Sequence, residues 1–224
     1  MTAERRRTLR LAHRGDWRHA PENTLAAMDA ALANPRCDGL EFDVRGSRDR
    51  VPVLLHDPSL RRVQGVDAEV ASLTAAELAD HAVPTLAEVL AVAGPGAFLD
   101  VELKGDPVPA VVEVLEGARG PLLERTVVSS FEPPMLQWLG RQRPRWPRWL
   151  NALDLSPLAI AIATDAGCSG VSVEWTAIDR PGLERAHAGG LEVAAWTVRE
   201  LPTYRSLESL GVAAICAERE ALDG

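Results

Sequence analysis

The 224-residue chain has few cysteines, few aromatic side chains and no long apolar run. Its three cysteines, Cys37, Cys168 and Cys216, are odd in number and widely spaced, which argues against a disulfide framework or a zinc site and favours buried, reduced thiols. No segment approaches the ~18 apolar residues of a membrane span, and residues 1–10 contain no apolar stretch long enough for a signal peptide. We therefore expect a soluble, cytoplasmic protein without stable membrane insertion.

Positive charge is also in short supply. The chain has 24 lysines and arginines against 32 acids, and its net charge of −8 disfavours a protein that works by neutralising nucleic-acid phosphates. Apolar residues make up 46 % of the chain, enough for a sizeable core, and the length is near the ~250 residues typical of one alternating barrel. We expect a single domain over residues 1–224, and the sequence does not indicate its oligomeric state.

Short leucine-rich and β-branched runs alternate along the chain with alanine-rich segments of helical periodicity. We predict eight core strands at residues 9–13, 39–44, 98–103, 126–130, 149–153, 171–174, 192–198 and 213–216. We predict helices, several opened by proline, at residues 24–33, 109–117, 134–141, 157–166, 181–188 and 200–210. Strict alternation favours parallel pairing with right-handed crossovers, and eight strands is the count of a TIM (β/α)8 barrel, an α/β fold.

One further run, at residues 51–56, follows the second strand too closely for a crossover helix. We therefore expect it to return antiparallel as a short β-hairpin after strand 2. Counted from the turn, Glu41 and His56 should lie roughly opposite one another, with a Cβ separation of ~5 Å if no bulge intervenes. Asp43 lies two residues from Glu41 and should point to the same face. A histidine and two carboxylates would then meet at the carboxyl end of one strand, where barrel enzymes keep their active sites.

The next parallel strand contributes further charged side chains. Alternation places Asp100, Glu102 and Lys104 on one face of residues 98–104. Carboxylates crowded in a barrel mouth repel one another unless a divalent cation or a lysine balances them. Hard oxygen ligands select magnesium, calcium or manganese over zinc. Asp100 sits earlier on its strand, so we expect it to form a structural ion pair.

Two histidines, His13 and His56, stand in short motifs around these acids, and this pattern is typical of acid/base chemistry beside a bound cation. A lone histidine at a strand end is more often structural, and the motif context is what favours catalysis here. Glu22 has two open interpretations, either supporting the site or belonging to the start of the next helix. Trp196, at a strand end, is predicted to wall the pocket, whereas Trp149 is predicted to pack helices on the barrel.

Eight motifs, taken in order, resemble the glycerophosphodiester phosphodiesterase family over nearly the whole chain. They read L-A-H-R-G, P-E-N-T, L-E-F-D-V, V-P-V-L-L-H-D-P-S-L-R-R, V-P-T-L-A-E-V-L, V-E-L-K, V-V-S-S-F and A-W-T-V. The resemblance implies a TIM barrel, a divalent cation (Mg²⁺, Ca²⁺ or Mn²⁺) and a small-molecule glycerophosphodiester substrate. It implies hydrolysis of that substrate to glycerol 3-phosphate and an alcohol.

By matching motif positions, the resemblance also implies roles for individual residues. His13 and His56 would be the acid/base pair, with His13 favoured as the base. The implied metal ligands are Glu41, Asp43 and Glu102. Phosphate contacts would come from Arg14 and Lys104.

The chain departs from the family pattern at two places. Arg199 stands where many members carry asparagine, and the last strand runs into Ala217-Glu218 where threonine-aspartate is usual. We expect neither to touch the catalytic set, and the two departures leave the specificity for the alcohol open. Two alternative functions stay open: a phospholipase-type activity on lysophospholipids or phosphoinositides, and a barrel that binds an anion without turnover.

Overall fold

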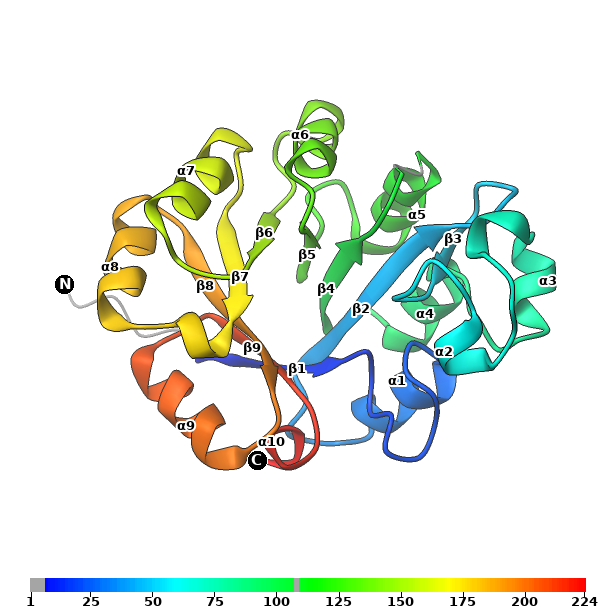
Figure 1. Cartoon of the computed structure of the whole chain (residues 1–224), viewed down its shortest axis with the longest axis horizontal. Helices are drawn as coiled ribbons and strands as arrows, with labels where there is room; N and C mark the ends of the chain where they lie inside the picture. The colour runs from blue at the N-terminus through cyan, green and yellow to red at the C-terminus, as the bar shows by residue number, and fades with distance from the viewer. Residues whose placement is uncertain (1–6, 107–108) are drawn as a thin grey trace.

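The computed structural model describes residues 7–106 and 109–224, so residues 1–6 of the segment searched for a signal peptide lie outside the described part. Eight parallel strands form a closed ring, because β1 pairs with both β9 and β2 (Figure 1). The ring contains β1 (Leu9–His13), β2 (Gly39–Gly46), β4 (Phe98–Leu103), β5 (Thr126–Ser130), β6 (Arg148–Ala152), β7 (Gly170–Glu174), β8 (Glu192–Val198) and β9 (Ala214–Ala217). The predicted TIM barrel is therefore confirmed.

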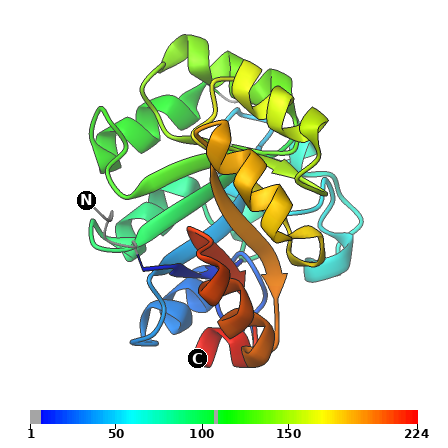
Figure 2. The same ribbon diagram turned by 90° about the vertical axis from the view of Figure 1, so that its left-hand side faces the viewer.

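Helices surround this ring, as the side view in Figure 2 also shows. They are α1 (Leu25–Leu32), α2 (Arg61–Gln64), η1 (Val70–Ser72), α3 (Ala75–Ala79), α4 (Leu86–Ala93), α5 (Ala110–Arg119), α6 (Pro133–Gln142), α7 (Pro157–Asp165), η2 (Trp175–Ala177), α8 (Arg180–Ala188), α9 (Leu201–Leu210) and α10 (Glu220–Asp223). Proline lies in the first turn of α6, α7, α8 and α9, where a missing backbone N–H costs no helical hydrogen bond. Within the described residues no helix has the length and apolar character needed to cross a bilayer.

The predicted hairpin is present, with β3 (Pro52–Leu54) bonded antiparallel to β2 outside the ring. The predicted register is wrong. Val44 pairs with Leu54, which is one residue out of the expected register, and the pairing stops there instead of reaching Glu41. The reason is that β2 continues through Gly46, a residue that the sequence pattern assigned to the turn. His56 therefore lies two residues beyond β3 and is not a strand residue.

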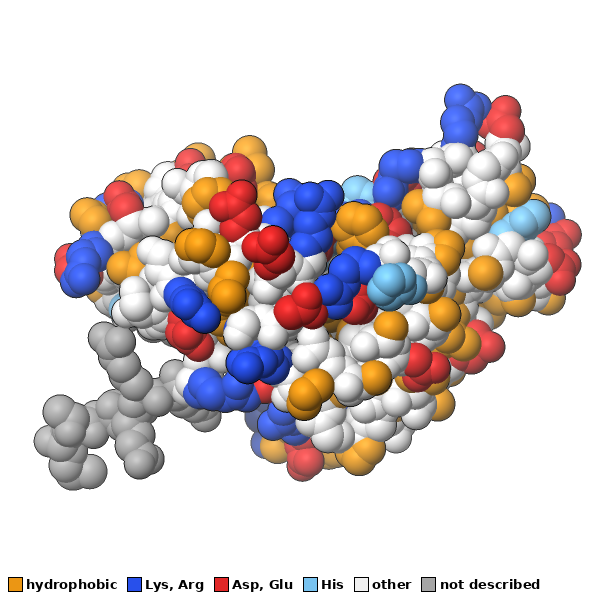
Figure 3. Space-filling view, turned by 90° about the horizontal axis from the view of Figure 1, so that it is seen from below, with side chains coloured by type: hydrophobic (Ala, Val, Ile, Leu, Met, Phe, Trp, Pro, Cys, Tyr) orange, Lys and Arg blue, Asp and Glu red, His pale blue; other side chains and the backbone are white. Residues whose placement is uncertain are grey.

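The loop after β1 is tied to the last helix, α10. Arg18, in the loop after β1, donates to Asp16 and to Asp223 of α10, each at 2.6 Å. Figure 3 looks at the side of the molecule that lies lowest in Figure 1, where α1, α9 and α10 are found, and acidic and basic side chains are interspersed across it. This clamp holds the loop that follows His13 against the last helix.

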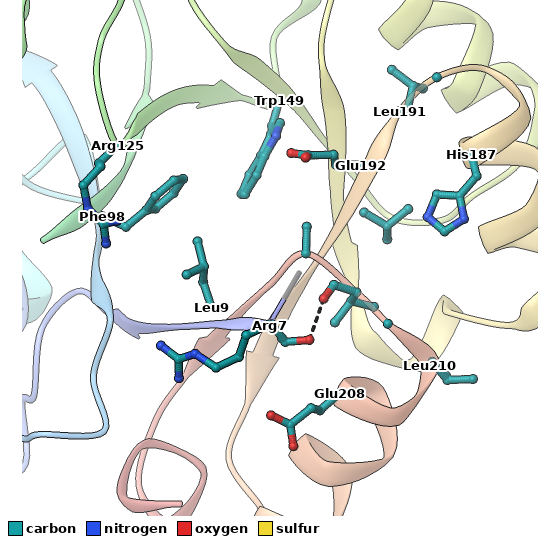
Figure 4. A pocket seen from close by; sticks show the side chains of 16 residues that line it. Arg7, Leu9, Phe98, Arg125, Trp149, His187, Leu191, Glu192, Glu208 and Leu210 are labelled. Carbon is teal, nitrogen blue, oxygen red and sulfur yellow. Dashed lines mark hydrogen bonds between the residues drawn. The ribbon is translucent and has the colours of Figure 1, made fainter. Parts of the chain in front are cut away.

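The barrel interior is apolar at its amino-terminal end. Leu11, Val127 and Trp149 belong to a buried cluster there, and Trp149 stacks on Phe98 with ring centroids 6.3 Å apart. The expectation that Trp149 packs helices on the barrel is thus wrong. Side chains alternate inward and outward along a strand, and Trp149 falls on the inward face. Figure 4 shows Trp149 and Phe98 facing a hollow of about 1000 Å³ at this end.

The other end of the interior is polar. On β2 the apolar side chains Leu40, Phe42 and Val44 are buried in the large cluster between strands and helices. Glu41 and Asp43 alternate with them and point inward, toward the carboxyl ends of the strands. Among the described residues, Glu41 and Glu102 line a pocket at this end of the barrel.

We predict that Gly170→Ala destabilises the barrel. A Cβ at this position would lie 2.7 Å from the Trp149 ring and 2.8 Å from the carbonyl oxygen of Glu192, so the strands or the indole must move. We expect the free energy of unfolding, measured by chemical denaturation, to fall by about 1–3 kcal/mol. Gly96→Ala is the matched control, because its Cβ meets nothing within 4 Å. Equal stabilities of the two variants would contradict this packing.

Candidate active site

Three carboxylates meet at the carboxyl end of the barrel. One oxygen from each of Glu41, Asp43 and Glu102 lies within 4.8 Å of the others, and all three residues are buried. The register explains the convergence, because Asp43 on β2 pairs with Glu102 on β4. These are the three residues that the resemblance implied as metal ligands. Such a donor set of hard oxygens suits magnesium, calcium or manganese.

The cluster is electrostatically unfavourable by itself. Burial, followed by the charges of Asp43 and Glu102, raises the pKa of Glu41 well above its usual value. Burial and Asp43 likewise raise the pKa of Glu102, although Lys104 opposes them. Burial also acts to raise the pKa of Asp43, but Arg14 and Lys104 outweigh it and the pKa is lowered. A divalent cation among these oxygens would relieve the repulsion that these shifts report.

Two basic side chains reach the same cluster. Lys104 Nζ lies 3.1 Å from Asp43 Oδ1 and also forms a very short contact with Glu102. Arg14 Nε lies 3.1 Å from the other Asp43 oxygen, Oδ2. That oxygen also accepts a hydrogen bond from Asn23 at 2.9 Å. Asp43 Oδ1 lies beside the ammonium group of Lys104 but has no partner with hydrogen-bonding geometry, as expected for an oxygen that could bind a metal ion.

His13 is held by a carboxylate from the far end of the chain. It is the last residue of β1, and its Nδ1 lies 2.6 Å from Oε1 of Glu218, directly after β9. The second oxygen of Glu218 accepts a hydrogen bond from Arg199 Nε at 2.8 Å. This arrangement leaves His13 Nε2 facing the cluster, 3.7 Å from Glu41. The sequence-based expectation that Arg199 and Glu218 stay away from the catalytic set is therefore wrong.

His56 has an equivalent anchor close in sequence. Its Nδ1 lies 2.7 Å from Oδ1 of Asp57, and Arg62 Nε donates to Oδ2 of Asp57 at 2.6 Å. Burial acts to raise the pKa of Asp57, but its hydrogen bonds with Arg62 and His56 lower it to about 2. Burial lowers the pKa of His56. Each histidine thus offers Nε2 as the ring nitrogen that is not held by a carboxylate.

An ion-pair chain joins the two histidine segments across the mouth. Arg62 on α2 donates to Glu22 at 2.6 Å, and Arg14 donates to the same Glu22 oxygen at 2.9 Å. For the segment that contains Glu22, two roles were left open, support of the site and the start of the next helix. Both roles are present, but different residues fill them. Glu22 supports the site, whereas Thr24 caps α1 by accepting a hydrogen bond from Ala27 N.

These groups line one pocket of about 430 Å³. His13, His56, Glu41 and Glu102 lie in its wall together with Trp196, as predicted for the tryptophan. The remaining predicted residues Arg14 and Lys104 also line it, and Asp43 lies buried behind it. The structure therefore brings every sequence-predicted site residue to one end of the barrel.

Asp100 differs from the expectation. Ser129 Oγ donates a hydrogen bond to Asp100 Oδ1 at 2.6 Å, and among the described residues no ion pair of Asp100 is found. Burial raises the pKa of Asp100 to about 7. The partner of Asp100 is Ser129 on the neighbouring strand β5, and the residue pattern of β4 alone could not predict that contact.

Comparisons with known proteins bear on the family and the fold. The model of the glycerophosphoryl diester phosphodiesterase family matches residues 13–221. A Bacillus subtilis relative, YhdW, which carries a provisional glycerophosphodiester phosphodiesterase name, is 27 % identical over 93 % of each chain. An Oleispira antarctica phosphodiesterase, solved with its product sn-glycerol 3-phosphate, is 26 % identical, with a TM-score of 0.83 over 94 % of this chain and 93 % of that one. A Thermotoga maritima structure, 21 % identical, shows the same fold with a TM-score of 0.82, covering 98 % and 97 % of the chains.

We predict that divalent cations stabilise the protein through the three carboxylates. A ligand that binds only the folded state adds about 2.7 kcal/mol at one hundred times its Kd, so Mg²⁺, Ca²⁺ or Mn²⁺ should raise Tm and EDTA should reverse the shift. Glu41→Gln removes one repelling charge and one ligand. We expect its cation-free Tm to be no lower than that of the parent protein, and its cation response to be largely lost.

The matched control is Glu124→Gln, at an exposed position on the opposite side of the barrel, which should keep the full response. Thermal melts with each cation and with EDTA provide the measurement. A full response in Glu41→Gln, or no response of the parent protein to any of the three cations, would remove the cation site.

Proposed function

The chain belongs to the glycerophosphoryl diester phosphodiesterase family, and we propose that it hydrolyses glycerophosphodiesters by acid/base catalysis from His13 and His56 beside a divalent cation. Family membership makes the protein a phosphodiesterase and excludes the alternative of a barrel that binds anions without turnover. The observation that carries the proposal is the pocket in which two carboxylate-anchored histidines face one cluster of three acids.

Glu41, Asp43 and Glu102 would hold the cation, because their oxygens converge and their mutual repulsion needs a positive charge. When bound, a divalent cation polarises a phosphoryl oxygen and offsets the negative charge that repels a nucleophile from a phosphodiester. Arg14 and Lys104 support the same task from the protein side. Each now contacts Asp43, so a phosphate arriving beside them exchanges one anionic partner for another.

In the first half of the proposed reaction, His13 Nε2 takes the proton of the glycerol 2-hydroxyl, and the oxygen attacks phosphorus. The bond between phosphorus and the alcohol oxygen breaks, and His56 gives its Nε2 proton to that oxygen. The alcohol leaves, and a cyclic glycerol phosphate stays in the pocket. Glu218 favours the positive charge that His13 acquires in this step, since its carboxylate lies 2.6 Å from Nδ1.

The second half reverses the two proton transfers. His56, now without its proton, takes one from water as the water oxygen attacks the cyclic phosphate. The bond to the glycerol 2-oxygen breaks, and His13 returns its proton to that oxygen. The product is glycerol 3-phosphate, and both histidines regain their starting states. The low pKa of Asp57 keeps that group ionised, so it can hold the His56 ring in one orientation through both halves.

We predict that the purified protein releases glycerol 3-phosphate from glycerophosphocholine, that EDTA abolishes the release, and that Mg²⁺, Ca²⁺ or Mn²⁺ restores it. His13→Gln should lower kcat by about 10²- to 10⁴-fold, the usual contribution of a general base. His187→Gln, at an exposed position on α8 that borders the amino-terminal hollow, should leave kcat unchanged. Inactivity of the cation-loaded protein on every glycerophosphodiester tested, or full activity of His13→Gln, would contradict the proposal.

We also predict that Glu218→Gln acts on kcat far more than on KM. The amide keeps the shape of the side chain but removes the charge beside His13 Nδ1, and we expect kcat to fall by about 10- to 100-fold. Glu220→Gln, two residues on and exposed, is the matched control. Steady-state kinetics on glycerophosphocholine provides both constants. If Glu218→Gln retained the parent kcat, Glu218 would be only a structural partner of Arg199.

A further inference from the structure

A further pocket, of about 400 Å³, lies between α9 and the loop after α1, outside the ring of strands (Figure 1). Among the described residues that line it, four are arginines, Arg7, Arg10, Arg36 and Arg205, and one is an acid, Glu208. We call it the arginine pocket. The whole chain has more acids than bases, with a net charge of −8, so this excess of positive charge is local. None of its described lining residues also lines the catalytic pocket.

Arg10 is the most buried of the four arginines, with only 8 % of its surface exposed. Leu9 and Leu11, its neighbours on β1, belong to the apolar cluster inside the barrel. Alternation along the strand therefore directs Arg10 outward, into the layer between strands and helices. Ala12, on the same face, belongs to the large apolar cluster there. A guanidinium in such a layer is costly unless a partner compensates its charge.

The contacts of Arg10 hold its side chain without neutralising it. The guanidinium lies over the ring of Tyr204 on α9, 4.0 Å from the centroid, which is a cation–π contact. The backbone of Gly224 packs against the end of the guanidinium so closely that a Cβ there would overlap Nη1. Nε is buried and has no hydrogen-bond partner among the described residues. A buried positive charge with an unused donor is thus left beside the pocket.

The other arginines of the pocket add to this positive charge. Arg36 and Arg205 are exposed at its edge. Within the described part of the chain, Arg7 pairs with Asp38, and no carboxylate pairs with the side chains of the other three arginines. These three stand against one acid, Glu208, which leaves a surplus of two positive charges.

We propose that the arginine pocket binds a small phosphate monoester at a site separate from the catalytic pocket. A phosphate monoester carries about −1.5 to −2 charges at pH 7, which matches the surplus. Guanidinium groups donate pairs of hydrogen bonds to phosphate oxygens. The pocket is much larger than a phosphate, and Leu201 and Pro35 in its wall offer apolar contact to an organic group. This inference does not depend on the proposed function.

The test is isothermal titration calorimetry of the EDTA-treated protein with phenyl phosphate. We expect the parent protein to bind it and Arg36→Gln/Arg205→Gln to bind it about tenfold more weakly or worse, the usual effect of losing one hydrogen bond to a charged group. Both side chains are exposed, so folding should be retained. Arg141→Gln/Arg145→Gln makes the same charge change at exposed positions outside the pocket and should keep the parent Kd.

Two further variants assign the binding to this pocket. Lys104→Gln alters the phosphate contacts expected in the catalytic pocket, and it should retain the binding of phenyl phosphate that depends on Arg36 and Arg205. Arg10→Met should abolish that binding. Replacing a buried charge by an apolar side chain of similar size is often tolerated, so this variant should fold. If it does not fold, the exposed pair Arg36→Gln/Arg205→Gln still decides the outcome.

Two further ligands test the chemical class. Phenyl sulfate has the shape of phenyl phosphate but a single negative charge, and we expect it to bind about fivefold more weakly or worse. Inorganic phosphate lacks the organic group. We expect it to bind about fourfold more weakly or worse, since burial of one methylene-sized apolar group is worth that much.

No binding of phenyl phosphate to the parent protein would overturn the inference, because the arginines would then be balanced within the chain. So would the parent Kd in Arg36→Gln/Arg205→Gln, or equal weakening in Arg141→Gln/Arg145→Gln. Loss of binding in Lys104→Gln would assign the ligand to the catalytic pocket instead. Binding to phosphatidate vesicles without binding of phenyl phosphate would indicate a lipid surface and would also overturn it. None of these results bears on hydrolysis in the catalytic pocket.

Discussion

The arrangement of the catalytic end depends on the repulsion among three buried carboxylates. Glu41, Asp43 and Glu102 come together because β2 and β4 are neighbours in parallel register, and the fold itself supplies only part of the balancing charge. Lys104 and Arg14 contact Asp43, yet the pKa values of Glu41 and Glu102 are still raised. The negative charge that Lys104 and Arg14 do not balance is suited to attract a divalent cation. The same two basic side chains are placed where a phosphate could contact them.

A carboxylate holds the ring of each histidine, but the two carboxylates come from different parts of the chain. His56 takes its anchor, Asp57, from the adjacent position in the chain, whereas His13 takes Glu218 from 205 residues away. Both anchors are themselves held by arginines, and Arg62 continues through Glu22 to Arg14 beside the acids. The anchor of His56 and the basic groups beside the acids are therefore joined in one chain of ion pairs.

The sequence predicted what depends on local periodicity and missed what depends on closure of the ring. Alternation along β2 and β4 identified Glu41, Asp43, Glu102 and Lys104, because a one-residue shift would have placed them among apolar neighbours. The resemblance to a known family implied the roles of His13 and His56, which the proposed experiments address. Contacts between separate strands were not predictable: Glu218 reaches His13 because β9 closes on β1, and Asp100 on β4 accepts a hydrogen bond from Ser129 on the neighbouring strand β5. The hairpin register was missed because β2 is longer than its apolar run.

The first position past each strand has one further consequence, which concerns how such a protein can change over evolutionary time. Three of these positions, Arg14, Lys104 and Arg199, lie in the wall of the pocket and outside the apolar core, so a replacement there changes the mouth rather than the packing of the barrel. A lineage could convert an apolar side of the mouth into a polar one, and so change which alcohol fits there, while retaining the same three buried acids and the same pair of imidazoles.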